Sequence, residues 1–498
     1  MELYVPKEAK MKISQRPKPV TSTGLILAVM ALILIPTSSL MAQQPAAAQK
    51  PTSETQQLLD RLQQLEQTVD GLKAQLKAIE EAKKISTGSA TGEKVAASTD
   101  TTAPTEAATT APGVPAKAPD DPKGESTFQI YGFAMLDMGY QFKQADPNWF
   151  DTVRPVKLPS RPNEFAPNGN FYSSVRQTRF GVKSSTPTKY GELKTIFEFE
   201  LFGTGADAGQ TTFRLRHAYG EMGQFGGGQY WSVFVDPDVF PNTNEYWGPN
   251  GIPWFRNVQF RWMPLKGKNS ITIGLERPGA SADLGRASDR IELQGVRPRF
   301  PLPDLTGNVR FDRGWGHVQV SGLLGAIKWV DTVADNFDLG GSATRFGISV
   351  NSGINMTKKD VVKLSFTYGK GSQNYMNDAP LDVGIQLNPG GGPRVPIKGV
   401  ALPMTAMMAY LDHRWNERFT SSVGYSWLEM DNSNGQLPSA FRRGKYASGN
   451  LLFYPVPNVM IGGEVIWGKR TNFLDLFSSE DVHVQFSFKY NFNKEFKF

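Results

Sequence analysis

The sequence contains no cysteine and only four histidines. A chain without cysteine forms neither disulfides nor reactive thiols, so burial and backbone hydrogen bonding have to stabilise it. No serine-centred nucleophile elbow occurs, and no glycine run lies between a strand and a helix as a phosphate loop would. The histidines are scattered without metal-ligand spacing, at His217, His317, His413 and His483. The sequence therefore predicts no enzyme, no metal site and no cofactor.

Long apolar stretches are also scarce, because hydrophobic residues make up 39% of the chain and a single run could pass for a membrane helix. That run, residues 25–35, follows four lysines and one arginine, and the small residue Ala42 comes shortly after it. It is short for a bilayer, which needs about 20 apolar residues. We expect a cleavable secretory signal over residues 1–42, with Met11 as an alternative start and a retained anchor as the alternative interpretation. Export, and the lack of a Lys/Arg cluster, argue against binding to nucleic acid.

Residues 43–84 carry a heptad pattern. Apolar side chains recur at alternating spacings of four and three, at Leu58, Leu62, Leu65, Val69, Leu72, Leu76 and Ile79. Such a seam on a polar helix cannot bury itself alone, so we expect an α-helical coiled coil in the periplasm that joins copies of the chain. A helix that docks on the rest of its own chain is the alternative. Residues 85–126, rich in Ala, Thr, Ser and Pro, are expected to form a flexible linker.

From residue 127 to the C-terminus, segments of about ten residues alternate between apolar and polar side chains and are separated by turn-type clusters. The clearest is the last, in which one face carries Val482, Val484, Phe486, Phe488, Tyr490 and Phe492. Successive side chains of a strand point to opposite faces, so one face meets lipid and the other meets water. The terminal Phe498 resembles the C-terminal signal of outer-membrane barrels. Residues 127–498 are therefore predicted to form an all-β transmembrane barrel.

The alternation predicts sixteen antiparallel strands of porin type. The predicted strands are 128–142, 171–184, 191–203, 211–224, 229–236, 255–264, 269–277, 305–313, 315–331, 342–356, 359–371, 400–415, 418–431, 445–454, 458–470 and 481–498. Short turns and long loops alternate consistently only if residues 278–303 form one long outer loop. Eighteen strands remain the alternative, with a hairpin inside that loop. An even number closes the barrel and leaves no open edge in the bilayer.

Sixteen strands leave an aqueous channel, so the charges that point inward decide what passes. A charge on the lipid face at midplane costs about 2–4 kcal/mol, so we assign the apolar face of each strand to lipid. The opposite face, which points into the pore, then carries five arginines. These are Arg179, Arg214, Arg216, Arg261 and Arg310. The same rule points Glu198 and Glu200 inward, where they could neutralise part of this wall, and points Tyr219 outward. Rings of arginine select for anions, and the guanidinium fork suits carboxylate and phosphate.

The segment 237–254, in the place of the third outer loop, is rich in turn-forming and aromatic residues. Its charged and aromatic side chains are Asp238, Glu245, Tyr246 and Trp247. Such a segment could fold inward and narrow the pore, and we take these four as constriction residues. An ordinary exposed loop is the alternative.

The whole chain resembles the DcaP-like porin family. The order of signal, coiled coil, linker and barrel matches, as do the segments QIYGF (129–133), RQTRF (176–180), GQYWS (228–232) and GWGHV (314–318). The resemblance implies a trimer of 16-stranded barrels and uptake of small anions, dicarboxylates in particular.

Residues and resemblance together favour an outer-membrane porin for passive, anion-preferring diffusion of small negatively charged solutes. The expected partners are these solutes, outer-membrane lipid and two further copies of the chain, held through barrel contacts and the coiled coil at 58–79. The alternative is a structural or adhesive barrel with a plugged lumen.

Overall fold

The computed structural model describes residues 124–203, 212–378, 380–475 and 477–498. The predicted signal, the coiled coil and most of the predicted linker lie outside these residues. Among the described residues, no helix is long and apolar enough to cross a membrane.

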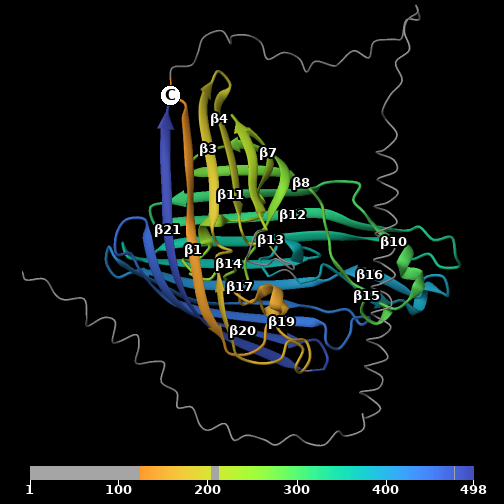
Figure 1. Ribbon diagram of the computed structural model, residues 1–498. Coiled ribbons are helices and arrows are strands. Elements are labelled where there is room, and N and C mark those ends of the chain that lie inside the picture. The colour runs from red at the N-terminus through yellow and green to blue at the C-terminus, as the bar shows by residue number, and fades with distance from the viewer. Residues whose placement is uncertain (1–123, 204–211, 379, 476) are drawn as a thin grey trace, which may run out of the picture. The chain divides into compact units, whose positions relative to one another are not determined.

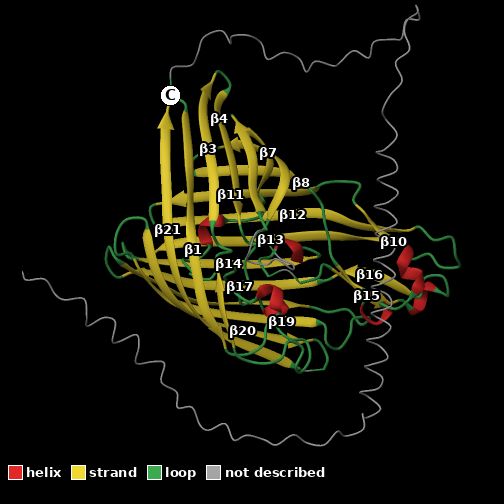
Figure 2. Cartoon of the chain, in the orientation of Figure 1, coloured by secondary structure: helices red, strands yellow, loops and turns green. Residues whose placement is uncertain are grey.

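The described residues form a closed antiparallel β-barrel (Figures 1 and 2). Its strands are β1 (Thr127–Gln141), β2 (Asn170–Ser174), β3 (Arg179–Thr188), β4 (Gly191–Glu200), β5 (Arg214–Met222), β6 (Phe225–Trp231), β7 (Arg256–Leu265), β8 (Asn269–Glu276), β10 (Val296–Arg299), β11 (Asp304–Arg313), β12 (Gly316–Asp331), β13 (Gly341–Asn355), β14 (Asp360–Lys370), β17 (Pro403–Arg414), β18 (Phe419–Met430), β19 (Phe441–Phe453), β20 (Val459–Asn472) and β21 (Ser478–Lys497). β2 and β3 both pair with β1, and β10 and β11 both pair with β12, so each of these couples is one interrupted strand. β1 pairs with β21 and closes the sheet. The prediction of sixteen strands is confirmed.

Short turns and long connections lie at opposite ends of the barrel. The short turns are 189–190, 223–224, 266–268, 314–315, 356–359, 415–418 and 454–458. They share their end with the C-terminus, because Thr127 pairs with both Lys497 and Ser185. The long connection 277–303 contains the two-residue strand β9 (Ala282–Asp283), short 3-10 helices and β10, but no hairpin within it joins the barrel. The eighteen-strand alternative is therefore wrong.

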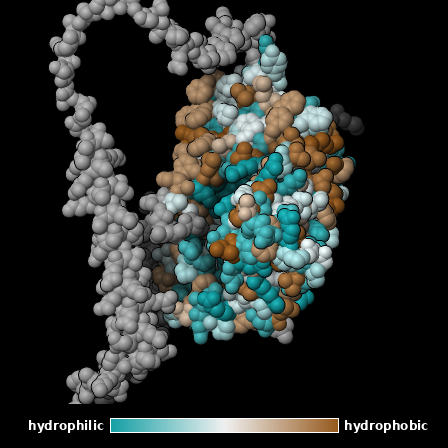
Figure 3. All heavy atoms as spheres, turned by 90° about the vertical axis from the view of Figure 1, so that its right-hand side faces the viewer, coloured by the Kyte–Doolittle hydropathy of each residue, from teal (hydrophilic) through white to brown (hydrophobic). Residues whose placement is uncertain are grey.

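The long-loop end carries a second, small sheet. β9 pairs with β15 (Val383–Leu387), which pairs with β16 (Ile397–Ala401). The last two residues of β16, 400 and 401, were expected to begin the strand 400–415, but Leu402 separates them from β17 and they belong to the loop sheet. In Figure 3 the side of the molecule that carries this sheet faces the viewer, with hydrophilic side chains over most of its centre and hydrophobic ones toward its edges.

The barrel is apolar outside and polar inside. Along β21, Val484, Phe486 and Phe488 are 42–48% exposed, whereas Gln485 and Ser487 are buried in the interior. A soluble protein would show the reverse pattern, since exposed apolar faces of this size cost free energy in water. The outer face of the described barrel therefore suits hydrocarbon.

Two local departures from regular alternation change which side chains face inward. A bulge in the β4–β5 pairing leaves Arg216 without an opposite residue, because Glu198 pairs with His217 and Phe199 with Leu215. After the bulge the parity of β5 is inverted, so Tyr219 is 7% exposed and lies inside. The prediction that Tyr219 faces lipid was wrong for this reason.

The second departure concerns the strand predicted at 229–236. β6 begins at Phe225 and ends at Trp231, so the glycines 226–228 belong to the strand and residues 232–236 do not. Gly226 has to lack a side chain, because a Cβ at this position would overlap the hydroxyl of Tyr219. The glycines looked like a turn in the sequence, but they make room for an inward tyrosine.

Replacing Phe488, in the middle of β21, by lysine is expected to destabilise the barrel by about 2–4 kcal/mol, the cost of a lysine on the lipid face near midplane. Phe488→Leu keeps an apolar side chain and should cost less than about 1.5 kcal/mol. Urea unfolding in phosphatidylcholine bilayers measures both changes. Equal stability of the two variants would show that this face is not in contact with lipid.

Candidate functional site

The connection between β6 and β7, residues 232–255, runs through the interior of the barrel, and we call it the inner segment. The Asn308 side chain of β11 donates to the carbonyl oxygen of Val233 (2.8 Å), and the backbone N–H of Asn250 donates to Ser426 of β18 (3.1 Å). The two wall residues come from strands that are distant from each other in the barrel. The inner segment, the wall and Val153 of the first long loop share a buried apolar cluster, whose other members are Val239, Ile252, Met408, Tyr410, Tyr446 and Ile466. The stretch predicted at 237–254 thus lies within the barrel as part of a longer segment.

Glu245 holds the inner segment to the wall. The backbone N–H groups of Asn244 and Glu245 both donate to one oxygen of Glu464 in β20, each at 2.6 Å. The Glu245 carboxyl accepts from the backbone of Gly248 (2.6 Å) and from the hydroxyl of Tyr446 (3.1 Å). Burial, and to a smaller extent the nearby Glu464, raise the pKa of Glu245 to about 8. The Glu245 side chain therefore lies between the backbone of the inner segment and the wall, and the residue is 2% exposed.

The two predicted aromatic residues of the inner segment, Tyr246 and Trp247, contact other parts of the barrel than β20. The ring of Tyr246 stacks on Phe202 with 3.8 Å between centroids, and its hydroxyl donates to Glu200. The indole of Trp247 donates to the carbonyl oxygen of Asn377 (3.1 Å). Both side chains therefore join the inner segment to charged and polar groups around it.

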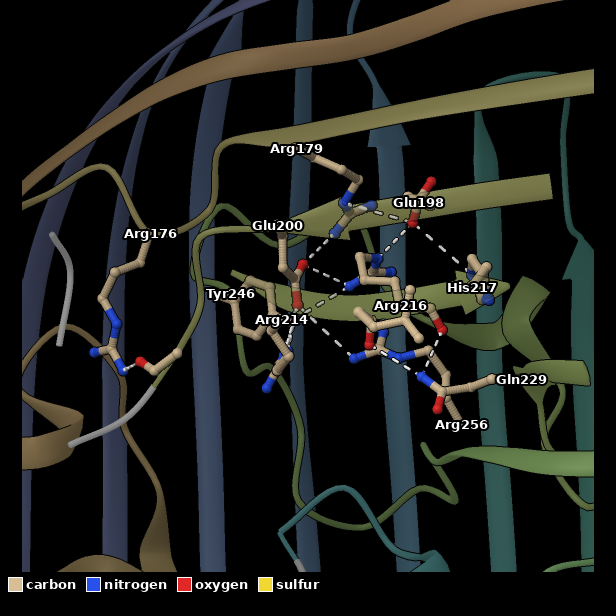
Figure 4. A network of polar contacts seen from close by, with 12 residues as sticks. Arg176, Arg179, Glu198, Glu200, Arg214, Arg216, His217, Gln229, Tyr246 and Arg256 are labelled. Atoms are coloured by element: carbon tan, nitrogen blue, oxygen red, sulfur yellow. Dashed lines mark hydrogen bonds and ion pairs between the residues drawn. The ribbon is translucent and has the colours of Figure 1, made fainter. Parts of the chain in front are cut away.

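A cluster of arginines surrounds Glu200 at the end of β4 (Figure 4). Register explains two of them, because Glu200 pairs directly with Arg179 of β3 and with Arg214 of β5. Arg179 lies 3.2 Å and the Nε of Arg214 2.9 Å from the carboxylate. The bulge adds Arg216 at 2.7 Å, and Arg256 lies 3.8 Å away. Three of the five predicted arginines therefore converge on one carboxylate.

Glu198 is the second carboxylate of this cluster. It lies 2.5 Å from Arg216 and 3.8 Å from Arg179, and it accepts from the Tyr131 hydroxyl at 2.7 Å. The glutamates thus neutralise part of the arginine wall. Among the described residues, four guanidinium groups face two carboxylates, which leaves two positive charges in excess.

The other two predicted arginines lie elsewhere in the barrel. Arg261 donates to the carbonyl oxygen of Trp231 (2.6 Å) and to Gln259 (2.7 Å), and no ion pair links it to a carboxylate among the described residues. Arg310 is held by three carboxylates at 2.7–3.2 Å, those of Asp236, Asp238 and Asp312. The local charge around Arg310 is therefore negative, which makes it a structural partner of the inner segment. The predicted constriction residue Asp238 is 62% exposed beside it.

Three arginines near the cluster escaped sequence reasoning. Arg256 begins β7 at a position whose parity indicates the lipid face, yet its guanidinium lies 5.0 Å from the ring of Trp231. Arg154 is in the first long loop, where alternation gives no information, and is paired with Asp378 at 3.1 Å. Arg176 is buried between β2 and β3, where it binds Asp151 at 2.7 Å and interrupts the strand predicted at 171–184. Of the three, only Arg256 directly follows aromatic residues in the sequence, Trp254 and Phe255, and no pattern marks the other two.

A cavity of about 340 Å³ opens beside the cluster, where β5 begins, β6 ends and β7 begins. Its lining, as far as the described residues form it, combines cations, amides and aromatic rings and includes no carboxylate: Arg154, Arg214, Leu215, Gln229, Tyr246, Trp247, Trp254, Phe255, Arg256, Asn374, Met376 and Asn377. The guanidinium of Arg154 lies between the rings of Trp149 and Trp247, at 4.1 and 4.0 Å from their centroids. This environment offers donors and positive charge, and it is suited to an anion.

Comparisons with known proteins identify the fold and the family. The DcaP outer membrane protein family matches residues 120–492. The outer membrane channel DcaP of Acinetobacter baumannii has a TM-score of 0.62 and 20% identity, with 76% of this chain and 100% of that chain covered. An anion-selective porin from Comamonas acidovorans has a TM-score of 0.46 and 11% identity over 74% of this chain and 100% of its own. No curated protein matches the sequence. The family match covers most of the barrel and confirms the predicted resemblance, so the chain belongs to the DcaP outer membrane protein family.

Proposed function

We propose that this protein is a porin through which small anionic solutes, dicarboxylates among them, diffuse passively across the outer membrane. The observation that carries the proposal is the arginine cluster at Glu198 and Glu200, with two excess positive charges beside a cavity whose described lining has no carboxylate. Positive charge inside a pore raises the local concentration of anions and lowers that of cations. The cluster would therefore set the sign of the selectivity.

Arg214, Arg256 and Arg154 have complementary parts in this proposal. All three line one cavity, so the two carboxylates of one solute can meet separate guanidinium forks. Glu200 would keep Arg214 and Arg256 in place and moderate their charge, so that a bound anion can also leave. The inner segment, with Tyr246 and Trp247, would narrow the passage next to these arginines.

The test is a reversal potential measured in planar bilayers that hold the full-length protein in a potassium chloride gradient. We expect chloride to be more permeant than potassium, by several-fold. A clear preference for potassium would exclude the anion-selective function, whatever the conductance.

A second candidate is a structural or adhesive barrel with a plugged lumen. The course of residues 232–255 through the interior favours it, because this segment contacts β11 and β18. The same bilayer recordings distinguish the two functions. Stable insertion of folded protein without measurable conductance would support the plugged barrel.

We also propose a homotrimer, held by contacts between barrels and by a coiled coil at residues 58–79. The heptad pattern of that region supports the coil.

A further inference from the structure

An unpaired group of cations lies on the outward face of the barrel at its long-loop end. In the pairing of β10 with β12, Arg299 is opposite Lys328 and Arg297 is opposite Val330. Arg297, Arg299 and Lys328 are exposed. Their side chains point away from the interior. Ile327, the neighbour of Lys328, points to the opposite face of β12 and is buried in the interior with 4% exposure. This group is called the rim cations.

The rim cations differ from the charged residues around them. Arg290 is paired with Glu292 at 3.1 Å, and the inward Arg345 is paired with Asp304 at 2.6 Å. Among the described residues, no carboxylate lies within ion-pair distance of the rim cations. Three cations without counter-ions on one face of two paired strands repel one another unless an anion joins them.

An apolar groove of about 630 Å³ lies on the same outward face, across β8, β11, β12 and β13. Its floor follows from the register, which aligns Ile273, Gly307, Gly322 and Ile348 in one row. A Cβ added to Gly322 would have no atom within 4 Å. The walls include Ile271, Leu305, Val309, Val320 and Leu324. Two adjacent glycines between larger side chains thus form an open groove in this apolar face.

β12 connects the rim cations to the groove, because it carries Lys328 near one end and Gly322 near its middle. Lys328, Leu324 and Gly322 share the outward face of β12, and Leu324 is 53% exposed. The six residue steps from Lys328 to Gly322 span about 20 Å at a strand rise of about 3.3 Å per residue. At the strand tilt of about 40° that such barrels have, this distance corresponds to about 15 Å along the bilayer normal, which is half of the hydrocarbon core. If the rim cations are at headgroup level, the groove is therefore at the depth of the acyl chains of the same leaflet.

We propose that this face is a binding site for a phosphorylated glycolipid of the outer leaflet. The phosphate would be bound by Arg299, Lys328 and Arg297, and an acyl chain would lie over Gly307 and Gly322. Long connections of such barrels face the cell exterior, so the rim cations meet the outer leaflet. Phosphate matches the charge and the fork of arginine, whereas the continuous apolar groove selects a lipid over a soluble anion. The proposal does not depend on the selectivity of the pore.

Native mass spectrometry of the full-length protein in detergent tests the proposal, with bis-phosphorylated lipid A and its dephosphorylated form as probes. We expect R299Q with K328Q to weaken binding of the phosphorylated lipid at least tenfold, and to leave the dephosphorylated lipid little changed. Gly322→Leu, which fills the groove, should weaken both lipids. The matched control is K358Q with R418Q, which removes two exposed cations from the short-turn end and should change neither affinity.

Three outcomes would overturn the proposal. Unchanged affinity of the R299Q and K328Q variant would show that the rim cations do not bind the phosphate. Full competition by inorganic phosphate would reduce the site to one for a free anion. A change of oligomeric state in the same variant, with lipid binding intact, would make this face a contact between copies of the chain. Folding of each variant is verified independently by circular dichroism.

Discussion

Replacing Arg214 and Arg256 together by glutamine is expected to remove most of the anion preference of the channel. The two substitutions subtract the two positive charges that exceed Glu198 and Glu200. Arg179 and Arg216 remain, so the buried Glu200 keeps two guanidinium partners, at 3.2 and 2.7 Å. The permeability ratio of chloride to potassium should fall toward one, by about three- to tenfold, or roughly 0.7–1.4 kcal/mol.

Reversal potentials at low ionic strength measure this change best, because the Debye length is about 10 Å at 0.1 M salt and only about 3 Å at 1 M. The control is the K358Q and R418Q variant, which loses the same net charge at the short-turn end and should retain the selectivity of the unmodified channel. If the two double variants are equally selective, the arginine cluster does not set the preference. The proposal for these arginines then fails, even if the channel itself conducts anions.

The barrel was predictable from the sequence because the bilayer imposes a period of two on every strand. An outward polar side chain or an unpaired edge is costly in hydrocarbon, so alternation and an even number of strands follow from elementary energetics. The last strand illustrates this, since Phe486 and Phe488 were assigned to lipid and Gln485 to the interior, as the structure has them. The number of strands also depended on the lengths of the connections, through the assignment of residues 278–303 to one loop.

The site was predictable only where strand parity holds. Arg179 and Arg214 lie within regular pairing and were placed correctly on the inner face, next to Glu200. The bulge at Arg216 inverted the parity of Tyr219, which no periodicity reveals. Arg256 lies at a strand end, where the chain leaves the ladder. Sequence patterns also gave no pairing between distant segments, such as the inner segment and β20.

The contact between the inner segment and β20 determines how firmly the segment is held. Two backbone N–H groups of the segment depend on one oxygen of Glu464, and an unsatisfied buried donor costs about 1–3 kcal/mol. The contact brings Glu245 and Glu464 into one buried site. The titratable groups around Glu245 are Glu464, Tyr446, Tyr410 and Tyr172. No cation of the described residues pairs with Glu245, so the seated segment favours its neutral form.

Raising the pH should therefore release the inner segment. The pKa of Glu245 is about 8 when the segment is seated and near its ordinary 4.5 when the side chain is in water. Between these values the seated state holds one proton more, so its stability is complete below about pH 4.5 and falls by about 1.4 kcal/mol per pH unit up to about pH 8. Single-channel recordings should show transitions to a higher conductance whose frequency rises up to tenfold per pH unit and levels off above pH 8.

Glu245→Gln separates this mechanism from any other effect of pH. Glutamine keeps an oxygen that can accept from Gly248 and Tyr446, but it cannot ionise. The conductance transitions of this variant should be rare at every pH between 5 and 9. Asp238→Gln is the matched control, because this carboxylate of the same segment is 62% exposed beside Arg310, and its variant should keep the pH dependence. If E245Q retains the full dependence, the buried carboxyl does not control the seating of the segment, and its raised pKa has no functional consequence.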